Sequence, residues 1–233
     1  MKIAAAQIKS NSNNTNENIK QHLRMIDEAA TKNVDLIVFP EMSLSGYERE
    51  LADKLSFSEN DSRLKVFKDK ALSNGMLIIV GAPIKLNSQL HIGSFIFFPD
   101  GTKSIYTKQF LHEGEEIYFS PNFNFNPLIN FHDEKISMAI CADISNPKHP
   151  ENASQNKTTL YIISFFYTPK GIAEGYQQLS EYAKKYSMNV LMSNYVGSSY
   201  NLDAAGKSAF WNKNGNIVKQ LSEDKEDLLI IKI

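Results

Sequence analysis

The segment DLIVFPE, residues 35–41, decides how this chain folds. Residues 36–39 are all apolar and do not alternate with polar ones, which is typical of a strand buried on both faces of a sheet. The strand ends at Pro40, and the carboxylate of Glu41 follows at once. The sequence therefore places an ionisable side chain at the end of a buried strand, where α/β proteins gather their functional groups.

Further strands and helices are predicted on both sides of this segment. Apolar or alternating runs indicate strands over residues 2–7, 76–83, 94–98, 103–106, 135–140, 160–164, 189–194, 209–211, 217–221 and 228–231. Apolar residues at helical spacing indicate helices around residues 19–30, 64–71 and 176–186. This order of elements predicts a layered α/β fold, and periodicity alone leaves open whether the strands form one open sheet or two stacked sheets.

Composition indicates one folded domain over residues 1–233, with 42% hydrophobic and 22% charged residues. The 25 basic and 26 acidic residues give a net charge of -1, which argues against a nucleic-acid partner. No apolar run has the length of a membrane span, and the amino-terminal residues lack the apolar core of a signal peptide. We therefore expect a cytoplasmic protein that is not embedded in a membrane.

Cys141 is the only cysteine, so neither an intramolecular disulfide nor a multi-cysteine metal site can form. A lone cysteine is more often a small buried apolar residue than a nucleophile. However, Cys141 follows a predicted strand, as Glu41 does, and Lys108 follows a predicted β-hairpin. Taken singly, Glu41 is better explained as an exposed loop carboxylate and Lys108 as a solvated hairpin lysine.

These three side chains form a complete set for attack on a carbonyl or nitrile carbon. A free thiol has a pKa of about 8.5 and is mostly protonated at neutral pH, so it needs a base or a neighbouring cation. The same reaction needs a proton donor for the leaving amine and a positive or hydrogen-bonding group for the oxyanion. A carboxylate, a lysine and a cysteine meet these needs together.

Three motifs resemble those of the nitrilase superfamily, the carbon–nitrogen hydrolases, and occur in the same order. They are DLIVFPEMSLSGY at residues 35–47, YTKQFL at 106–111 and CADISNP at 141–147. The opening AAQ at residues 5–7 and the late NYVG at 194–197 extend the resemblance over nearly the whole chain. The resemblance implies a four-layer αββα sandwich, built from two stacked mixed sheets between helices, that pairs as a homodimer.

The resemblance also implies a role for each residue of the motifs. Glu41 would be the general base, Lys108 would hold the tetrahedral intermediate, and Cys141 would form a thioester or thioimidate. The backbone amide of Ala142 would help Lys108 to bind the oxyanion. Glu115 matches a second glutamate that many members have, with Glu116 as the alternative.

The remaining site residues are assigned to the substrate or to structure. Tyr47, which ends the first motif, and the aromatic group at 165–167, with Phe166 at its centre, are expected to line the substrate pocket. Asp143 either caps the turn after the nucleophile by binding backbone amides or contacts substrate. Residues 147–159 resemble the family only loosely, so the part of the pocket wall that they build is not predicted.

Two departures from the family patterns narrow the expected substrate. Ser145 and Asn146 stand where relatives that act on carboxylate-bearing substrates often have an arginine, which argues against a bidentate carboxylate clamp. Nitrilases proper usually have tryptophan and glutamate after the cysteine, but Ala142 and Asp143 follow here. We expect a small amide or an N-carbamoyl compound (a ureide) rather than a nitrile, and no cofactor or metal.

Several alternatives stay open at this point. The chain could be a catalytically idle relative that binds a small molecule, a nitrile hydrolase, or a glutaminase domain that supplies ammonia to a separate synthetase. A papain-like pair of Cys141 with His112, His132 or His149 is a further alternative. A metal hydrolase is disfavoured, because no His-x-x-x-His or Cys-x-x-Cys spacing occurs.

Overall fold

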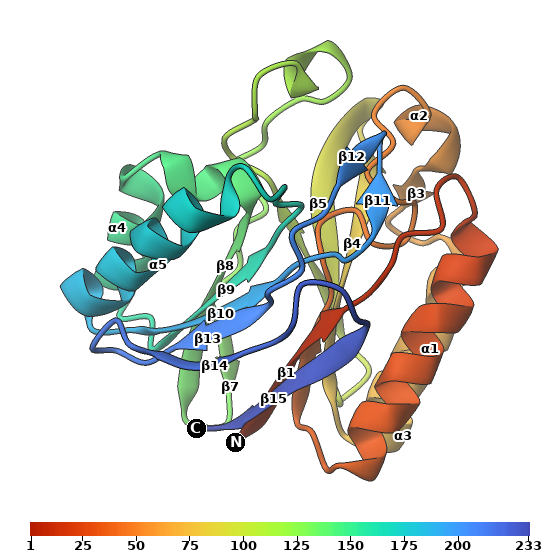
Figure 1. The fold of residues 1–233 in the computed structure, drawn as a ribbon. Helices are drawn as coiled ribbons and strands as arrows, with labels where there is room; N and C mark the ends of the chain where they lie inside the picture. The colour runs from red at the N-terminus through yellow and green to blue at the C-terminus, as the bar shows by residue number, and fades with distance from the viewer.

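A computed structural model describes residues 1–233 and contains two β-sheets packed face to face, with helices on the outside of each (Figure 1). The first sheet has the strand order β15-β1-β2-β4-β5-β6, with β3 also paired to β4, and the second has the order β14-β13-β10-β9-β8-β7. Helices α1 and α3 cover the first sheet, and α4 and α5 cover the second. The predicted four-layer αββα sandwich is confirmed.

The bounds of the elements are as follows. The first sheet contains β1 (Lys2–Gln7), β2 (Leu36–Val38), β3 (Phe57–Ser58), β4 (Leu77–Leu86), β5 (Gln89–Phe97), β6 (Lys103–Thr107) and β15 (Asp227–Lys232). The second contains β7 (Ile129–Phe131), β8 (Glu134–Ile140), β9 (Leu160–Ser164), β10 (Asn189–Ser193), β13 (Ala209–Trp211) and β14 (Ile217–Gln220), while β11 (Ser198–Ser199) and β12 (Leu202–Asp203) form a separate hairpin. The helices are α1 (Thr15–Thr31), α2 (Ala52–Leu55), α3 (Lys65–Asn74), α4 (Lys148–Gln155) and α5 (Ile172–Tyr186), with 3₁₀ turns η1 (Ser62–Leu64), η2 (Glu115–Ile117) and η3 (Cys141–Ser145).

The direction of the strands brings the predicted catalytic residues to one end of the sandwich. In the first sheet β2 is parallel to β4, while β4 pairs antiparallel with β5 and β5 with β6, so β2 and β6 end at the same edge. In the second sheet β8, β9 and β10 are parallel. The residues that follow β2, β6 and β8 are those of the three motifs.

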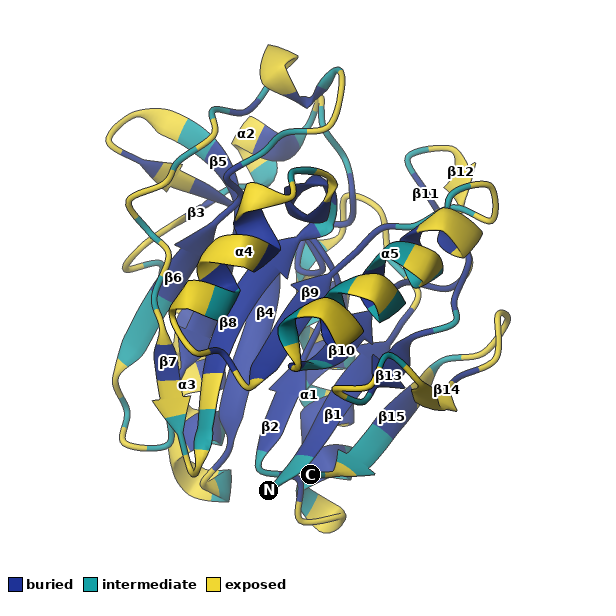
Figure 2. Ribbon diagram, turned by 90° about the vertical axis from the view of Figure 1, so that its left-hand side faces the viewer, coloured by how far each residue is buried: buried dark blue, intermediate teal, exposed yellow.

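Local sequence signals account for the long helices. The Asn14 side chain accepts a hydrogen bond from the backbone N–H of Glu17 and caps α1. Gly75 ends α3 in a left-handed conformation with φ +61°, which suits glycine best. Helices α4 and α5 turn buried faces toward their sheet and expose their outer faces (Figure 2).

Helix α4 lies within residues 147–159, where no helix or strand was predicted. Its buried face is made of His149, Pro150 and Ala153, which are too polar or too small to give a clear apolar period. Pro150 is tolerated because it lies in the first turn, where backbone N–H groups have no partner within the helix. None of the helices combines the length and apolar character that a bilayer crossing requires.

Gly81 of β4 lies against the backbone on both sides of Glu41. A Cβ atom at this position would be 2.4 Å from the carbonyl oxygen of Pro40 and 2.6 Å from the backbone nitrogen of Met42. Backbone atoms cannot relieve such a clash by a change of rotamer, as the end of a flexible side chain can. Gly81 is therefore the residue that lets the strand end carrying Glu41 approach β4.

We expect Gly81→Ala to lower the free energy of unfolding by about 2–3 kcal/mol, because an added methyl group in a tightly packed interior forces the backbone to shift. The measurement is urea denaturation followed by circular dichroism. Ser94→Ala, opposite Gly81 on β5, is the control: its buried hydroxyl has no hydrogen-bond partner, so its loss should change stability little. Equal stability of the two variants would show that the contact with Pro40 and Met42 carries no constraint.

Candidate active site

The loop that carries Glu41 is held by buried hydrogen bonds from three segments. Met42, the next residue, has a left-handed φ of +51°, which turns the chain sharply after β2. The Ser43 hydroxyl accepts from the backbone N–H of Gly81 at 3.1 Å and contacts Nε2 of His22 on α1 at 2.9 Å. Tyr195 donates its hydroxyl proton to the carbonyl oxygen of Glu41 at 2.8 Å. The glutamate backbone is thus fixed from both sheets and from α1.

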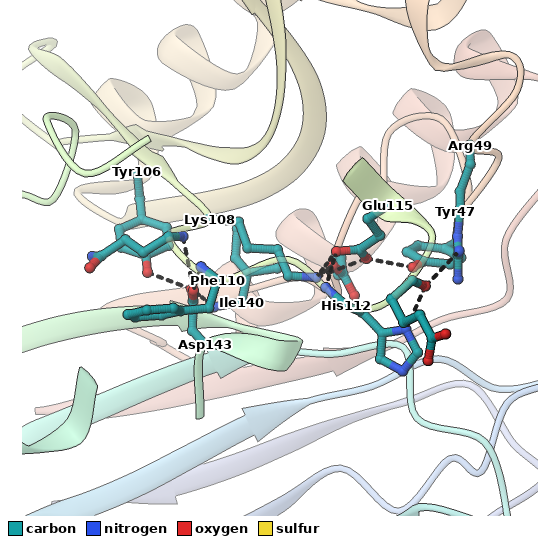
Figure 3. Close-up of polar contacts among 12 residues, drawn as sticks. Tyr47, Arg49, Tyr106, Lys108, Phe110, His112, Glu115, Ile140 and Asp143 are labelled. Atoms are coloured by element: carbon teal, nitrogen blue, oxygen red, sulfur yellow. Dashed lines mark hydrogen bonds and ion pairs between the residues drawn. The ribbon is translucent and has the colours of Figure 1, made fainter. Parts of the chain in front are cut away.

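Lys108 lies between two carboxylates in the interior of the protein (Figure 3). Its Nζ donates to Glu41 Oε1 at 2.7 Å and to Glu115 Oε1 at 2.9 Å, and lies 2.8 Å from Glu115 Oε2. All three side chains have an exposed fraction of 0%. The structure therefore joins the residues that three separate sequence segments contributed, and Glu115 rather than Glu116 is the second glutamate at Lys108.

Glu115 has donors on both of its oxygens besides Lys108. The Tyr47 hydroxyl donates to Oε1 at 2.5 Å, and the backbone N–H of His112 donates to Oε2 at 2.8 Å (Figure 3). Glu41 differs, because its Oε2 is buried and has no hydrogen-bond partner. One carboxylate is saturated with donors, and the other keeps a free acceptor oxygen.

Cys141 follows β8 directly and begins η3. Its φ is +43°, a conformation that a non-glycine residue rarely adopts and that tightly packed surroundings must impose. The side chain is partly exposed, in contrast to the buried Glu41 and Lys108. Ala142 lies in the first turn of η3, where backbone N–H groups have no acceptor within the turn, and it lines the same cavity as Cys141.

Asp143 connects the cysteine turn to the lysine segment. Its Oδ1 accepts from the backbone N–H groups of Gln109 at 2.9 Å and Phe110 at 2.8 Å, and its Oδ2 accepts from Ile140 N–H at 2.8 Å and the Tyr106 hydroxyl at 2.6 Å (Figure 3). The side chain is fully buried. Of the two roles considered from sequence, the structure shows the backbone cap: Asp143 fixes Cys141 relative to Lys108.

The two glutamates have opposite pKa shifts. Burial raises the pKa of Glu41 to about 7, although the charge of Lys108 opposes the rise. Burial also acts on Glu115, but Lys108 and the donors on its oxygens outweigh it and lower its pKa. At neutral pH Glu115 is thus a fixed negative charge, while Glu41 can exchange a proton.

Lys108 and Cys141 also depart from their ordinary pKa values. Burial alone would lower the pKa of Lys108, but the charges of Glu41, Cys141 and Glu115 raise it, so the ammonium persists. Burial and the neighbouring Glu41 raise the pKa of the Cys141 thiol well above its usual value, and Lys108 reduces the rise only in part. The resting sulfur is therefore a thiol, and its attack on a carbon requires a base.

Cys141 opens into a cavity of about 210 Å³. An adjoining cavity of about 410 Å³ shares His112, Ala142 and Ser145 with it. The other residues that line the first cavity are Tyr167, Gly171, Glu174, Gly175 and Gln178. No three His, Cys, Asp or Glu side chains are grouped so that they could hold a metal ion.

The aromatic residues predicted to contact substrate lie in two different places. Tyr167 lines the cavity, but Phe166 does not: it is buried against Tyr47, with ring centroids 5.0 Å apart, and against Tyr195. The Phe166 ring thus packs away from the cavity wall that Tyr167 forms, and contact of Phe166 with substrate stays a prediction. Tyr47 contacts Glu115 and is not among the residues that line the cavity.

No histidine forms a hydrogen bond with Cys141. His149 is buried and contacts the hydroxyl groups of Tyr106 at 2.9 Å and Tyr161 at 2.6 Å. His112 lines the cavity, and its Nδ1 lies 3.1 Å from the carbonyl oxygen of Glu113. The structure thus offers no counterpart of a papain-like Cys-His pair.

Comparisons with known proteins agree with this fold. The chain is 26% identical to a glutamine-dependent NAD(+) synthetase of Acinetobacter baylyi, over 97% of this chain and 43% of that protein, and thus spans less than half of its length. It is 23% identical to a probable nitrilase of Schizosaccharomyces pombe, over 97% of this chain and 86% of that protein. The crystal structure of an amidase from Nesterenkonia sp. AN1 superposes with a TM-score of 0.90 at 18% identity, over 100% of this chain and 90% of that one.

The family described as carbon-nitrogen hydrolase matches residues 2–233. The match includes the strand ends that carry Glu41, Lys108 and Cys141 and the turn that carries Glu115. Because it extends over nearly the entire sequence, this chain belongs to the carbon–nitrogen hydrolase family.

Proposed function

We propose that this protein is an amidase that hydrolyses the carbon–nitrogen bond of a small amide or N-carbamoyl compound through an acyl-enzyme on Cys141. The observation that carries the proposal is the position of Lys108, whose Nζ is 2.7 Å from Glu41 Oε1 and 2.8 Å from Glu115 Oε2 in the dry interior beside the cysteine cavity. Burying three charged groups is costly, because each loses its water shell. The arrangement is therefore unlike a surface ion pair and indicates a role in packing or in chemistry.

In the first half of the reaction, the free oxygen of Glu41 takes the proton from the Cys141 thiol as the sulfur attacks the carbonyl carbon. The oxyanion of the tetrahedral intermediate is stabilised by the Lys108 ammonium and the backbone N–H of Ala142. Collapse of the intermediate breaks the carbon–nitrogen bond, and the proton on Glu41 passes to the leaving nitrogen. Ammonia or an amine leaves, and a thioester remains on Cys141.

In the second half, water replaces the amine. Glu41 takes a proton from the water molecule while the water oxygen attacks the thioester carbon. Lys108 and the backbone N–H of Ala142 stabilise the second oxyanion. The carbon–sulfur bond then breaks, and the proton returns from Glu41 to the thiolate. The acid product leaves, and Glu41 and Cys141 are restored.

Glu115 supports this cycle without touching the reacting atoms. Its lowered pKa keeps it ionised, so Lys108 stays charged whether or not Glu41 carries a proton. Without this second carboxylate, protonation of Glu41 would leave a buried ammonium with no counter-ion. We propose that Glu115 and its partner Tyr47 position Lys108.

Hydrolysis of the side-chain amide of glutamine is a second candidate. It is favoured by the similarity of this chain to a glutamine-dependent NAD(+) synthetase over 97% of its residues. In that case the released ammonia would serve a synthetase activity, on the same polypeptide or on a separate partner. Glutamine therefore belongs in the first substrate panel.

The experiment that tests the proposal is a panel of small aliphatic amides, glutamine, N-carbamoyl compounds and nitriles. Released ammonia or amine is measured together with the intact mass of the protein. Amine release together with an acyl adduct supports the proposal. If no compound is hydrolysed and Cys141 is inert to iodoacetamide in the folded protein, the chain is an idle binder and the proposal is wrong.

We expect Cys141→Ala to lower turnover by at least about a thousandfold, because the nucleophile is lost while the other catalytic groups remain. Its thermal unfolding should match that of the wild type, because the removed group is a partly exposed sulfur. Mass spectrometry should find the acyl group on the wild type and none on the variant. Turnover near the wild-type level in Cys141→Ala would exclude the acyl-enzyme.

We expect kcat/KM to fall about tenfold for each pH unit below about 7, since Glu41 must be ionised to accept the thiol proton and burial raises its pKa to about 7. The measurement is a pH profile of kcat/KM with a neutral amide. Glu41→Gln should abolish turnover at every pH, whereas Glu116→Gln, an exposed neighbour of Glu115, should leave the profile unchanged. A limb centred near 4.5 would show that a solvated carboxylate, and not Glu41, controls the rate.

A further inference from the structure

The cavity beside Cys141 is lined by acceptors of hydrogen bonds and by no lysine or arginine. Its one fixed charge is the carboxylate of Glu174, and the adjoining cavity adds that of Glu113. Neither carboxylate takes part in an ion pair within the protein. Away from Lys108, which faces the reacting carbonyl, a substrate that enters therefore meets negative charge with no lysine or arginine on the cavity wall beside it.

Glu174 lies on the first turn of α5, and its neighbour on the cavity wall is Gln178, one turn further along the same face. The Gln178 side-chain amide donates to the Ile144 carbonyl oxygen at 3.0 Å and contacts the Tyr182 hydroxyl at 3.0 Å. Both of its N–H groups are thus used inside the protein, so the carbonyl oxygen is what it can offer to a ligand.

Tyr167 belongs to the same cavity wall as Glu174 and Gln178, and this wall also contains the nucleophile Cys141. Its ring packs so closely on α5 that a Cβ atom at Gly175 would lie 2.4 Å from the Tyr167 hydroxyl oxygen. The wall formed by Tyr167, Glu174 and Gln178 continues directly from the cysteine.

We infer that the site selects amides that carry an ammonium group a few atoms from the carbonyl carbon. Glu174 and the carbonyl oxygen of Gln178 bind this ammonium group. The inference rests on the proposed function and names the substrate class of that same site. An ammonium group needs acceptors and a counter-charge, and the wall offers both. A carboxylate at the same place would meet Glu174 without a compensating cation, in keeping with the lack of an arginine after Cys141.

The first experiment measures charge selection without turnover. The single cysteine is converted to a mixed disulfide, with release of methanesulfinate, by methanethiosulfonates that carry a trimethylammonium, an uncharged methyl or a sulfonate group. Each rate is divided by the rate with free mercaptoethanol. We expect the cationic reagent to exceed the anionic one by about tenfold or more, and Glu174→Gln to reduce this ratio about threefold to tenfold, because an exposed charge pair contributes modestly.

Glu181→Gln is the matched control, since it removes the same charge two turns further along α5, about 10 Å away and near the screening length of physiological salt. It should leave the ratio within about twofold of the wild type. An equal ratio in wild type and Glu174→Gln, or equal loss in both variants, would overturn the inference.

The second experiment compares hydrolysis of three amides of matched length: 4-aminobutanamide, pentanamide and glutaramic acid. We expect kcat/KM to fall in that order, with Glu174→Gln raising KM for the cationic amide and leaving pentanamide unchanged. Equal rates for the cationic and anionic amides would refute the selection. It is possible to separate the two proposals. If none of the three amides is hydrolysed but the rates of Cys141 modification still depend on reagent charge and on Glu174, the amidase proposal fails while charge selection by the cavity stands.

Discussion

The buried ammonium of Lys108 is the constraint on which the rest of the structure depends. A cation in the interior is tolerated only if opposite charges and hydrogen bonds replace its water shell, and removing one partner of such a pair costs about 3–5 kcal/mol. Glu41 and Glu115 supply those charges from two distant segments of the first 120 residues. The end of β2, the end of β6 and the turn at η2 must therefore meet at one point, and the packing of both sheets keeps them there.

The two carboxylates around this lysine are not equivalent, and their difference comes from their surroundings. Glu115 is surrounded by donors, whereas Glu41 has one oxygen on Lys108 and one with no partner. Charge and hydrogen bonds stabilise the ionised form of the first, and burial destabilises that of the second. The same residue type is thus an ionised counter-ion in one position and can exchange a proton near neutral pH in the other, with a single lysine between them.

The sequence predicted the parts of this arrangement that have a local signature. The apolar run before Glu41, the hairpin before Lys108 and the strand before Cys141 could each be read from periodicity and turn residues, and resemblance to a family supplied their roles. Tyr167 was predicted together with Phe166, but the direction of each side chain depends on the course of the backbone after β9. That course was not readable, so the sequence could not tell which of the aromatic rings lines the cavity.

Other contacts of the site have no local sequence pattern from which they could be predicted. The contact of His22 with Ser43 and the hydrogen bonds of Asp143 with Tyr106, Gln109 and Phe110 join residues that are far apart in the chain. Helix α4 escaped prediction because its buried face is formed by a histidine, a proline and an alanine. Polar contacts over long sequence distances follow from the fold, and they become visible only after the strands have been placed.

The pairing of β1 with β15 has a consequence for the order in which the protein assembles. β1 is synthesised long before β15, so one of its edges stays unpaired until residues 227–232 arrive, and the backbone contact between Met1 and Ile233 joins residues 232 positions apart. Contacts of such separation form slowly, and a bare apolar strand edge invites pairing with other chains meanwhile. We therefore expect the nascent polypeptide, rather than the folded protein, to be the form most prone to aggregation, and chaperones that cover strand edges to matter most before β15 is made.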